Sequence, residues 1–137
     1  MVFSFSDKFC NPPEVSITNL PDRRMRKSVV SILRSKDFII QATARERECN
    51  SSQALQLQWY LFKFKIKASG NIEIQKKIPS VSRTTEWTLR KRTLDYGEYY
   101  VEFRAAYSNQ PSVKSSILGF FKVSKSKLIA EIGRAHV

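Results

Sequence analysis

The sequence has few of the residues that build catalytic and metal sites. Its 137 residues include one histidine, two cysteines and four glycines. The histidine is His136, next to the end, so the rest of the chain has no imidazole for general base catalysis or metal binding. The cysteines, Cys10 and Cys49, lack the CxxC spacing of a zinc site. We therefore expect a protein that is not an enzyme, with no catalytic residue, no metal and no cofactor.

Long apolar runs are also absent. No stretch approaches the ~20 apolar residues that a membrane-spanning helix needs. Residues 1–9, MVFSFSDKF, lack the basic segment and long apolar core of a secretory signal peptide. If the protein is extracellular, we expect its signal to lie upstream of this sequence.

Acidic residues are half as numerous as basic ones, 12 against 24, which gives a net charge of +12. This excess indicates affinity for an anionic partner such as nucleic acid, sulfated glycan or lipid headgroups. Residues 23–27 form a basic cluster, which is either a solvated loop or a targeting or docking segment. Two other groups are candidate anion-binding residues: Lys63, Lys65, Lys67, Arg90, Lys91 and Arg92. The lysine stripe has an alternative role, because lysines on an edge strand also prevent aggregation.

The clearest pattern lies in residues 94–107, LDYGEYYVEFRAAY. Apolar and polar residues alternate from Tyr99 onward, which predicts a strand with one buried face. Leu94, Gly97 and Tyr99 have the spacing of a tyrosine corner, in which the tyrosine hydroxyl bonds to backbone upstream and fixes a crossover between two sheets. The alternative is that Tyr99 is an ordinary core residue.

Other short strands are expected at residues 14–18, 28–33, 38–42, 55–67, 71–78, 83–89 and 113–123. About seven strands, with Trp59 in the third, predict an all-β fold: a two-sheet β-sandwich of fibronectin III or immunoglobulin-like type. We expect Tyr99, Trp59 and Phe103 to meet in its core. Most aromatic residues are expected to face inward, with Tyr60 and Tyr100 as the outward exceptions.

The strand at 55–67 contains a change of pattern. Leu55, Leu57, Trp59 and Leu61 share one parity, whereas Phe62, Phe64 and Ile66 share the other. Because a one-residue slip would turn the buried face outward, we predict a β-bulge near Leu61 and Phe62.

The cysteines leave the compartment open. Paired with each other, Cys10 and Cys49 would close a loop worth roughly 4 kcal/mol. They could also be buried free thiols, or have partners outside this sequence. Asn50 begins the N-glycosylation sequon Asn-Ser-Ser in a predicted loop, which favours an extracellular location.

The chain is expected to divide into an extension at 1–9, one module at 10–130 and a tail at 131–137. The tail ends in IGRAHV, and a DNA string that encodes these residues resembles the start of a common sequencing adapter. The alternative is a natural tail. We expect the tail to be non-native and the natural protein to continue past Ala130, which would remove His136.

Several segments occur in a distinctive order: CNPPEV at 10–15, RSKDFIIQA at 34–42, Cys49 followed by Asn50, Trp59, TLDYGEY at 93–99, and VSKSKLIA at 123–130. In this combination the chain resembles the receptor-for-egg-jelly (REJ) region of the polycystin family. The sequence departs from the family in lacking further cysteines around its third strand and in lacking a His-Leu-Ser/Thr cleavage motif.

The resemblance implies an extracellular piece of a multi-pass membrane glycoprotein related to receptors and cation-channel subunits. Such regions consist of successive β-sandwich modules that bind ligands or act as spacers. The implied partners are neighbouring modules and anionic glycans or protein ligands, with membrane attachment through segments beyond this sequence. The alternative is a basic intracellular nucleic-acid-binding domain, which needs aromatic rings on an exposed face.

Overall fold

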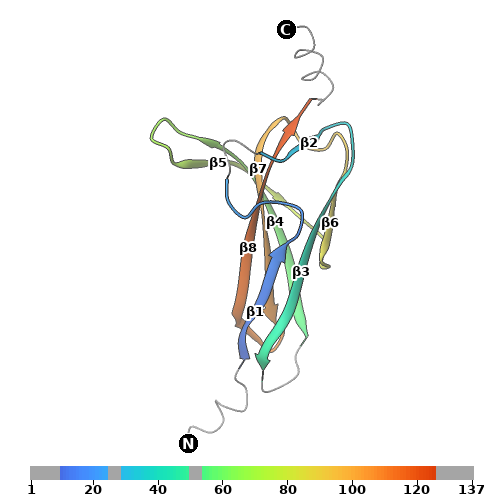
Figure 1. Ribbon diagram of the computed structural model, residues 1–137, viewed down its shortest axis with the longest axis vertical. Helices are drawn as coiled ribbons and strands as arrows, with labels where there is room; N and C mark the ends of the chain where they lie inside the picture. Colours follow the sequence, from blue (N-terminus) through green and yellow to red (C-terminus); the bar gives the residue numbers. More distant parts are fainter. Residues whose placement is uncertain (1–9, 25–28, 50–53, 126–137) are drawn as a thin grey trace, which may run out of the picture.

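The computed structural model describes residues 10–24, 29–49 and 54–125, which form two packed β-sheets (Figure 1). One sheet has the order β1-β3-β6 and the other the order β2-β8-β7-β4-β5. The strands are β1 (Cys10–Ile17), β2 (Ser31–Leu33), β3 (Phe38–Cys49), β4 (Leu55–Ile66), β5 (Ile72–Pro79), β6 (Glu86–Leu89), β7 (Gly97–Tyr107) and β8 (Gln110–Ser124). The predicted two-sheet sandwich is confirmed, with eight strands rather than about seven.

The first three strands differ most from their predicted ranges, and β3 differs most of all, because it continues past its predicted end at residue 42 to Cys49. β1 begins at Cys10, although the prolines after it predicted a turn or an extended entry. Its pairing with β3 is irregular between Asn11 and Glu14, where the two prolines have no N–H to donate. β2 is only three residues long and pairs in parallel with β8.

The core is built on β7, as its alternating sequence predicts. Val101, Phe103, Ala105 and Tyr107 have no exposed surface. The Trp59 ring lies 4.5 Å from the Phe103 ring, and Tyr99 stacks on Phe121 at 5.5 Å. Tyr99, Trp59 and Phe103 belong to one buried cluster, so the predicted meeting of these rings is confirmed.

The predicted tyrosine corner is present at the start of β7. The Tyr99 hydroxyl donates a hydrogen bond of 2.8 Å to the carbonyl of Asp95, four residues upstream. Gly97 between them has a φ of +145°, which side chains rarely adopt. Burial, and then the negative charge of Asp95, raise the pKa of Tyr99 from 10.0 to about 12. Tyr99 therefore fixes the crossover and remains neutral at physiological pH.

The predicted β-bulge at Leu61 and Phe62 is wrong. β4 pairs with β7 in unbroken register from Leu55 to Phe64. The irregularity lies in β5, where Lys63 pairs with Lys76 but Phe64 pairs with Ile74, so one residue of β5 is left over.

The apolar pattern of β4 changes parity because different layers cover the two faces of the larger sheet along its length. The first part of β4 buries its inner face against the other sheet, and the later part also buries side chains on the outer face. Phe64 lies on the outer face of the larger sheet, where it is only 3% exposed. Beside this face, at the edge of β8, the Pro21 carbonyl accepts a hydrogen bond of 2.9 Å from the Phe120 amide. Pro21, Arg24 and Val29 line a pocket with Phe64 and Phe120 there.

The expectation that Tyr60 and Tyr100 are the outward exceptions is therefore incomplete. On the same outer face Phe62 stacks on Tyr100 at 5.0 Å, and Tyr100 lies 5.5 Å from Phe120. These rings are half-buried and pack mainly against one another.

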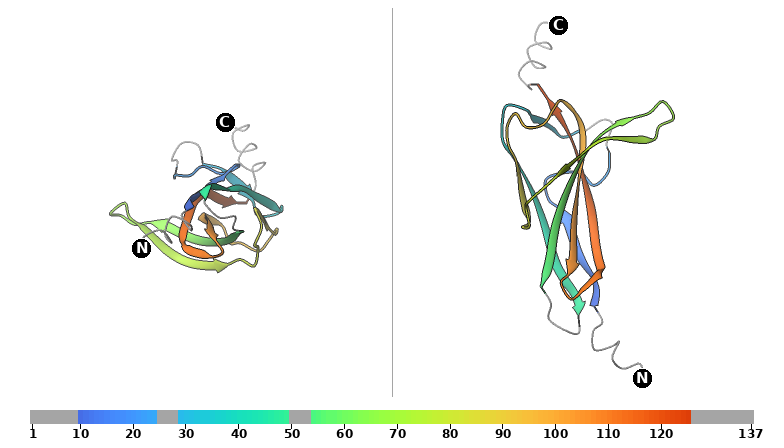
Figure 2. Two further views of the ribbon diagram at one scale, coloured as in Figure 1. Left: turned by 90° about the horizontal axis from the view of Figure 1, so that it is seen from below. Right: turned by 180° about the vertical axis from the view of Figure 1, so that it is seen from behind.

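The two ends and the two seams of the sandwich differ. β1 begins at one end and β8 finishes at the opposite end (Figures 1 and 2). β1 and β2 are the end strands of the two sheets at one seam, and β6 and β5 are the end strands at the other. The β4–β5 hairpin projects from the body of the molecule (Figure 2). Within residues 10–24, 29–49 and 54–125, no helix is long and apolar enough to cross a membrane.

Candidate functional site

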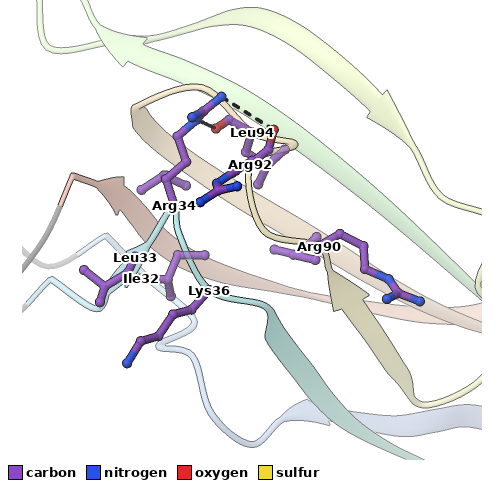
Figure 3. Close-up of a pocket in the computed structure, with 9 residues that line it drawn as sticks. Ile32, Leu33, Arg34, Lys36, Arg90, Arg92 and Leu94 are labelled. Atoms are coloured by element: carbon purple, nitrogen blue, oxygen red, sulfur yellow. Dashed lines mark hydrogen bonds between the residues drawn. The ribbon is translucent and has the colours of Figure 1, made fainter.

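Two loops meet at the end of the sandwich where β8 finishes. They are the turn from β2 to β3 and the loop from β6 to β7. The Arg92 amide donates to the carbonyl of Arg34 at 2.7 Å, and the Arg34 guanidinium donates to the carbonyl of Leu94 at 2.9 Å (Figure 3). The Lys91 amide donates to the Asp37 carboxylate at 2.7 Å. These bonds fix the β6–β7 loop directly before the tyrosine corner.

The same contacts gather positive charge. We call the group Arg34, Lys36, Arg90, Lys91, Arg92 and Lys125 the basic pole. Arg34 and Lys125 both approach the ring of Tyr96, at 5.5 and 5.9 Å from its centre. The Tyr96 side chain is 46% exposed, so an aromatic ring flanked by two cations faces solvent.

No side chain of the basic pole forms an ion pair with a carboxylate in the part of the chain that the structure describes. The ion pairs there join Asp22–Arg23, Arg24–Glu98, Glu14–Arg45, Lys65–Glu73, Lys67–Glu73 and Glu102–Arg104. The charge of the basic pole is therefore screened by solvent and available to an anionic partner.

The structure separates the two predicted anion-binding groups. Arg90, Lys91 and Arg92 belong to the basic pole, together with the basic residues of the β2–β3 turn. Lys63, Lys65 and Lys67 instead follow β4 toward the projecting hairpin. There Glu73 pairs with Lys65 at 3.7 Å and with Lys67 at 3.8 Å.

Lys63 has a different environment from the rest of the stripe. It is partly buried, and its chain lies against Gly97: a Cβ placed on Gly97 would come within 2.9 Å of the Lys63 Cε. In the β4–β5 ladder it lies directly opposite Lys76. Like charges in this position repel each other, and neither lysine has an ion-pair partner among the described residues.

Arg34, Lys36, Tyr96 and Lys125 were not among the sequence candidates. Arg34 and Lys36 lie in a predicted turn, and their spacing carries no sign of a partner more than fifty residues away. Only the packing of the two loops brings them beside Arg92.

A groove lies beside the basic pole, between β5 and β6. It has a volume of about 270 Å³. We call it the β5–β6 groove; its lining residues are Leu61, Lys76, Lys77, Ile78, Pro79, Trp87, Thr88, Leu89, Arg90, Thr93 and Leu94. Arg90 and Leu94 also line the small pocket of the basic pole, so the groove and the pole adjoin.

The cysteines lie at the other end of the molecule. Cys10 is 5% exposed and lies directly opposite Cys49 in the β1–β3 ladder. Opposed residues of antiparallel strands have Cα atoms ~4.5–5.5 Å apart, within the range that disulfides span. The structure contains no free cysteine among the described residues.

Several sequence predictions lie outside the described residues. They concern Asn50, which directly follows β3, the extension at 1–9, and the tail at 131–137 with His136.

The likeness to known proteins can now be stated. A family model described as "REJ domain" matches residues 42–133, which is more than half of the chain. The chain belongs to the REJ domain family. No curated protein and no solved structure matches it. The match begins within β3 and runs through β8, so it includes the β5–β6 groove and the members of the basic pole from Arg90 onward, whereas Arg34 and Lys36 precede it.

Proposed function

We propose that this REJ domain is a non-catalytic extracellular module of a polycystin-like multi-pass membrane protein, acting in ligand binding or as a structural spacer. The observation that carries the proposal is the family match over a sandwich whose first strand starts at one end and whose last strand finishes at the other. Modules with this polarity can be joined in a row, so neighbouring modules of the same ectodomain are the first expected partners. Anionic glycans or protein ligands are the second.

Two features support an oxidising, extracellular setting. Cys10 and Cys49 are neighbours in the ladder, and a disulfide between them would fasten the start of the domain to the end of β3. The sequon at Asn50 follows this point in the chain.

Secretion of the chain behind a heterologous signal peptide tests the proposal. We expect a secreted protein whose mass falls on enzymatic removal of N-glycans, and whose cysteines react with a thiol reagent only after reduction. Asn50→Gln is the control for the glycan, and Cys10→Ser leaves Cys49 as a reactive thiol. A protein that is retained in the cell, unglycosylated and fully thiol-reactive would contradict an extracellular module.

The unpaired basic pole also supports a second candidate, a basic domain that binds nucleic acid. Against it, Phe62, Tyr100 and Phe120 stack on one another, and the exposed ring of Tyr96 is already flanked by Arg34 and Lys125. Binding of single-stranded DNA at physiological salt, together with an unmodified Asn50, would favour this candidate.

A further inference from the structure

We propose that the β5–β6 groove binds an extended acidic peptide of a partner protein, with the peptide's apolar side chains in the groove and its carboxylates on the cations at the rim of the groove, Lys76 and Arg90. The inference rests on the proposed function of the domain as a binding module. It adds the site and the chemistry of the ligand.

The floor of the groove is apolar. Leu61 is fully buried, and Leu89 and Leu94 are 5% and 8% exposed. Ile78 and Trp87 are partly buried and pack against the same core. The volume of about 270 Å³ lies just below the range of ~300–1,000 Å³ that is typical of sites for whole small molecules. It therefore suits a few side chains of a longer ligand.

The groove lies at the seam between β5 and β6, which are end strands of the two sheets. The end strands at the other seam are β2, which pairs with β8, and β1, which pairs with β3. β5 and β6 have a strand neighbour on one side only. An edge strand can receive a further chain through its backbone groups.

The backbone of β6 restricts where such a chain can pair. Thr85 accepts a hydrogen bond from the Ala42 amide, so every second residue of β6 faces β3, and Glu86 and Thr88 face the open side. The hydroxyls of Ser82 and Thr84 already donate to the Glu86 carbonyl, at 2.7 and 3.0 Å. Only Thr88, which lines the groove, keeps its outward backbone groups without a partner among the described residues. A ligand therefore gains little from backbone pairing and depends on its side chains.

The charges around the groove select an acidic ligand. Lys76 and Arg90 line it, and neither forms an ion pair with a described residue. Lys76 also faces Lys63 across the β4–β5 ladder. A carboxylate placed between Lys63 and Lys76 would replace the repulsion of the two lysines by its attraction to each of them.

The apolar floor selects a peptide over other polyanions. A nucleic acid or a sulfated sugar chain would use the cations but leave Ile78 and Trp87 in contact with water. In an extended peptide, alternate side chains point to opposite sides. Alternating apolar and acidic residues therefore satisfy the floor and the rim together.

The test uses a fluorescein-labelled peptide in which leucine and glutamate alternate, and fluorescence anisotropy at physiological ionic strength. A peptide of equal length and charge, with serine in place of leucine, probes the floor without altering the protein. The Lys76→Gln/Arg90→Gln double variant probes the rim. Lys114→Gln/Lys122→Gln, at two exposed positions of β8, removes the same charge elsewhere.

We expect the leucine peptide to bind the wild-type domain more tightly than the serine peptide. The rim variant should raise its Kd about five- to tenfold, as two lost ion pairs of ordinary strength imply, and the β8 variant less than twofold. The Trp87 indole resonance should shift on binding.

Four results would overturn the inference. Equal binding of the two peptides would mean that the floor is unused. An equal loss in both double variants would mean that only the net charge matters. Failure of any peptide to bind a secreted, glycosylated domain would remove the groove inference and leave the proposed function intact, whereas displacement by single-stranded DNA would favour the nucleic-acid alternative.

Discussion

Replacing Tyr99 by phenylalanine removes one hydrogen bond and one titrating group from the crossover between the two sheets. The ring is 1% exposed and its hydroxyl donates to the Asp95 carbonyl, so the variant keeps the packing but leaves that carbonyl without its donor. A lost hydrogen bond of this kind costs about 1–3 kcal/mol of unfolding free energy. We expect Tyr99→Phe to be less stable than the wild type by this amount at neutral pH.

The size of this difference depends on pH. Burial and Asp95 raise the pKa of Tyr99 from 10.0 in its ordinary state to about 12. The folded-state pKa of Tyr99 is higher than its unfolded-state pKa. The neutral Tyr99 hydroxyl therefore contributes its full share to the unfolding free energy below pH 10, and this share is lost as the pH rises toward 12. At pH ~11 the unfolded chain is mostly ionised at this residue and the folded chain is not. At this pH the unfolding free energy is lower by about 1.4 kcal/mol than at neutral pH because of Tyr99.

The measurement is urea unfolding at pH ~8 and ~11, with the buried Trp59 and the partly buried Trp87 as fluorescent reporters. Between the two pH values, the unfolding free energy of the wild type should fall by about 1.4 kcal/mol more than that of Tyr99→Phe. The raised pKa of Tyr100 affects both proteins equally and cancels in the comparison. Tyr96→Phe, at an exposed ring, is the matched control and should behave as the wild type. Equal pH dependence of wild type and Tyr99→Phe would refute the tyrosine-corner argument.

Three further predictions concern the stability of the folded domain. Cys10→Ser should lower the unfolding free energy by roughly 4 kcal/mol, as loss of a loop-closing disulfide implies. Reduction of the wild type should have the same effect. If the reduced and the unreduced wild type unfold at the same urea concentration, the two cysteines are not paired. Gly97→Ala should lower the unfolding free energy by about 1–3 kcal/mol, because the φ of +145° disfavours a side chain and the new Cβ would meet Lys63 Cε at 2.9 Å. Urea unfolding of the Gly97→Ala/Lys63→Ala double variant separates the two causes. If the double variant is as unstable as Gly97→Ala, the cost comes from the backbone. Gly119→Ala should cost about 1–3 kcal/mol through overpacking, because its Cβ would lie 3.0 Å from Ile17 Cδ1 and about as close to a neighbouring leucine, and an unchanged melting temperature would contradict this.

The open side of the sandwich also explains the charges of its edge strand. β5 is exposed along most of its length and carries Lys76 and Lys77, while Ile72 and Ile74 are 44% and 45% exposed. Edge lysines discourage unspecific pairing with other chains. The same positive charges admit a ligand of opposite charge, so protection of the edge and selection of an acidic partner are compatible.

The sequence by itself determined the parts of the fold that depend on neighbouring residues. Alternation along β7 predicted its buried face, and the spacing of Leu94, Gly97 and Tyr99 predicted the hydrogen bond to the crossover. Both follow from the period-two geometry of a strand and from the φ that one glycine permits, which are local properties.

Only the tertiary structure decided which layer covers which face. The pattern of β4 changes parity at Phe62 because Pro21, Arg24 and Val29 lie against the outer face near Phe64, and no local signal distinguishes this from a bulge. The basic pole likewise depends on two loops that lie more than fifty residues apart and are held together by Arg34 and Asp37. Long-range packing selects both arrangements, because the stability of each comes from contacts that do not exist until the sheets have closed.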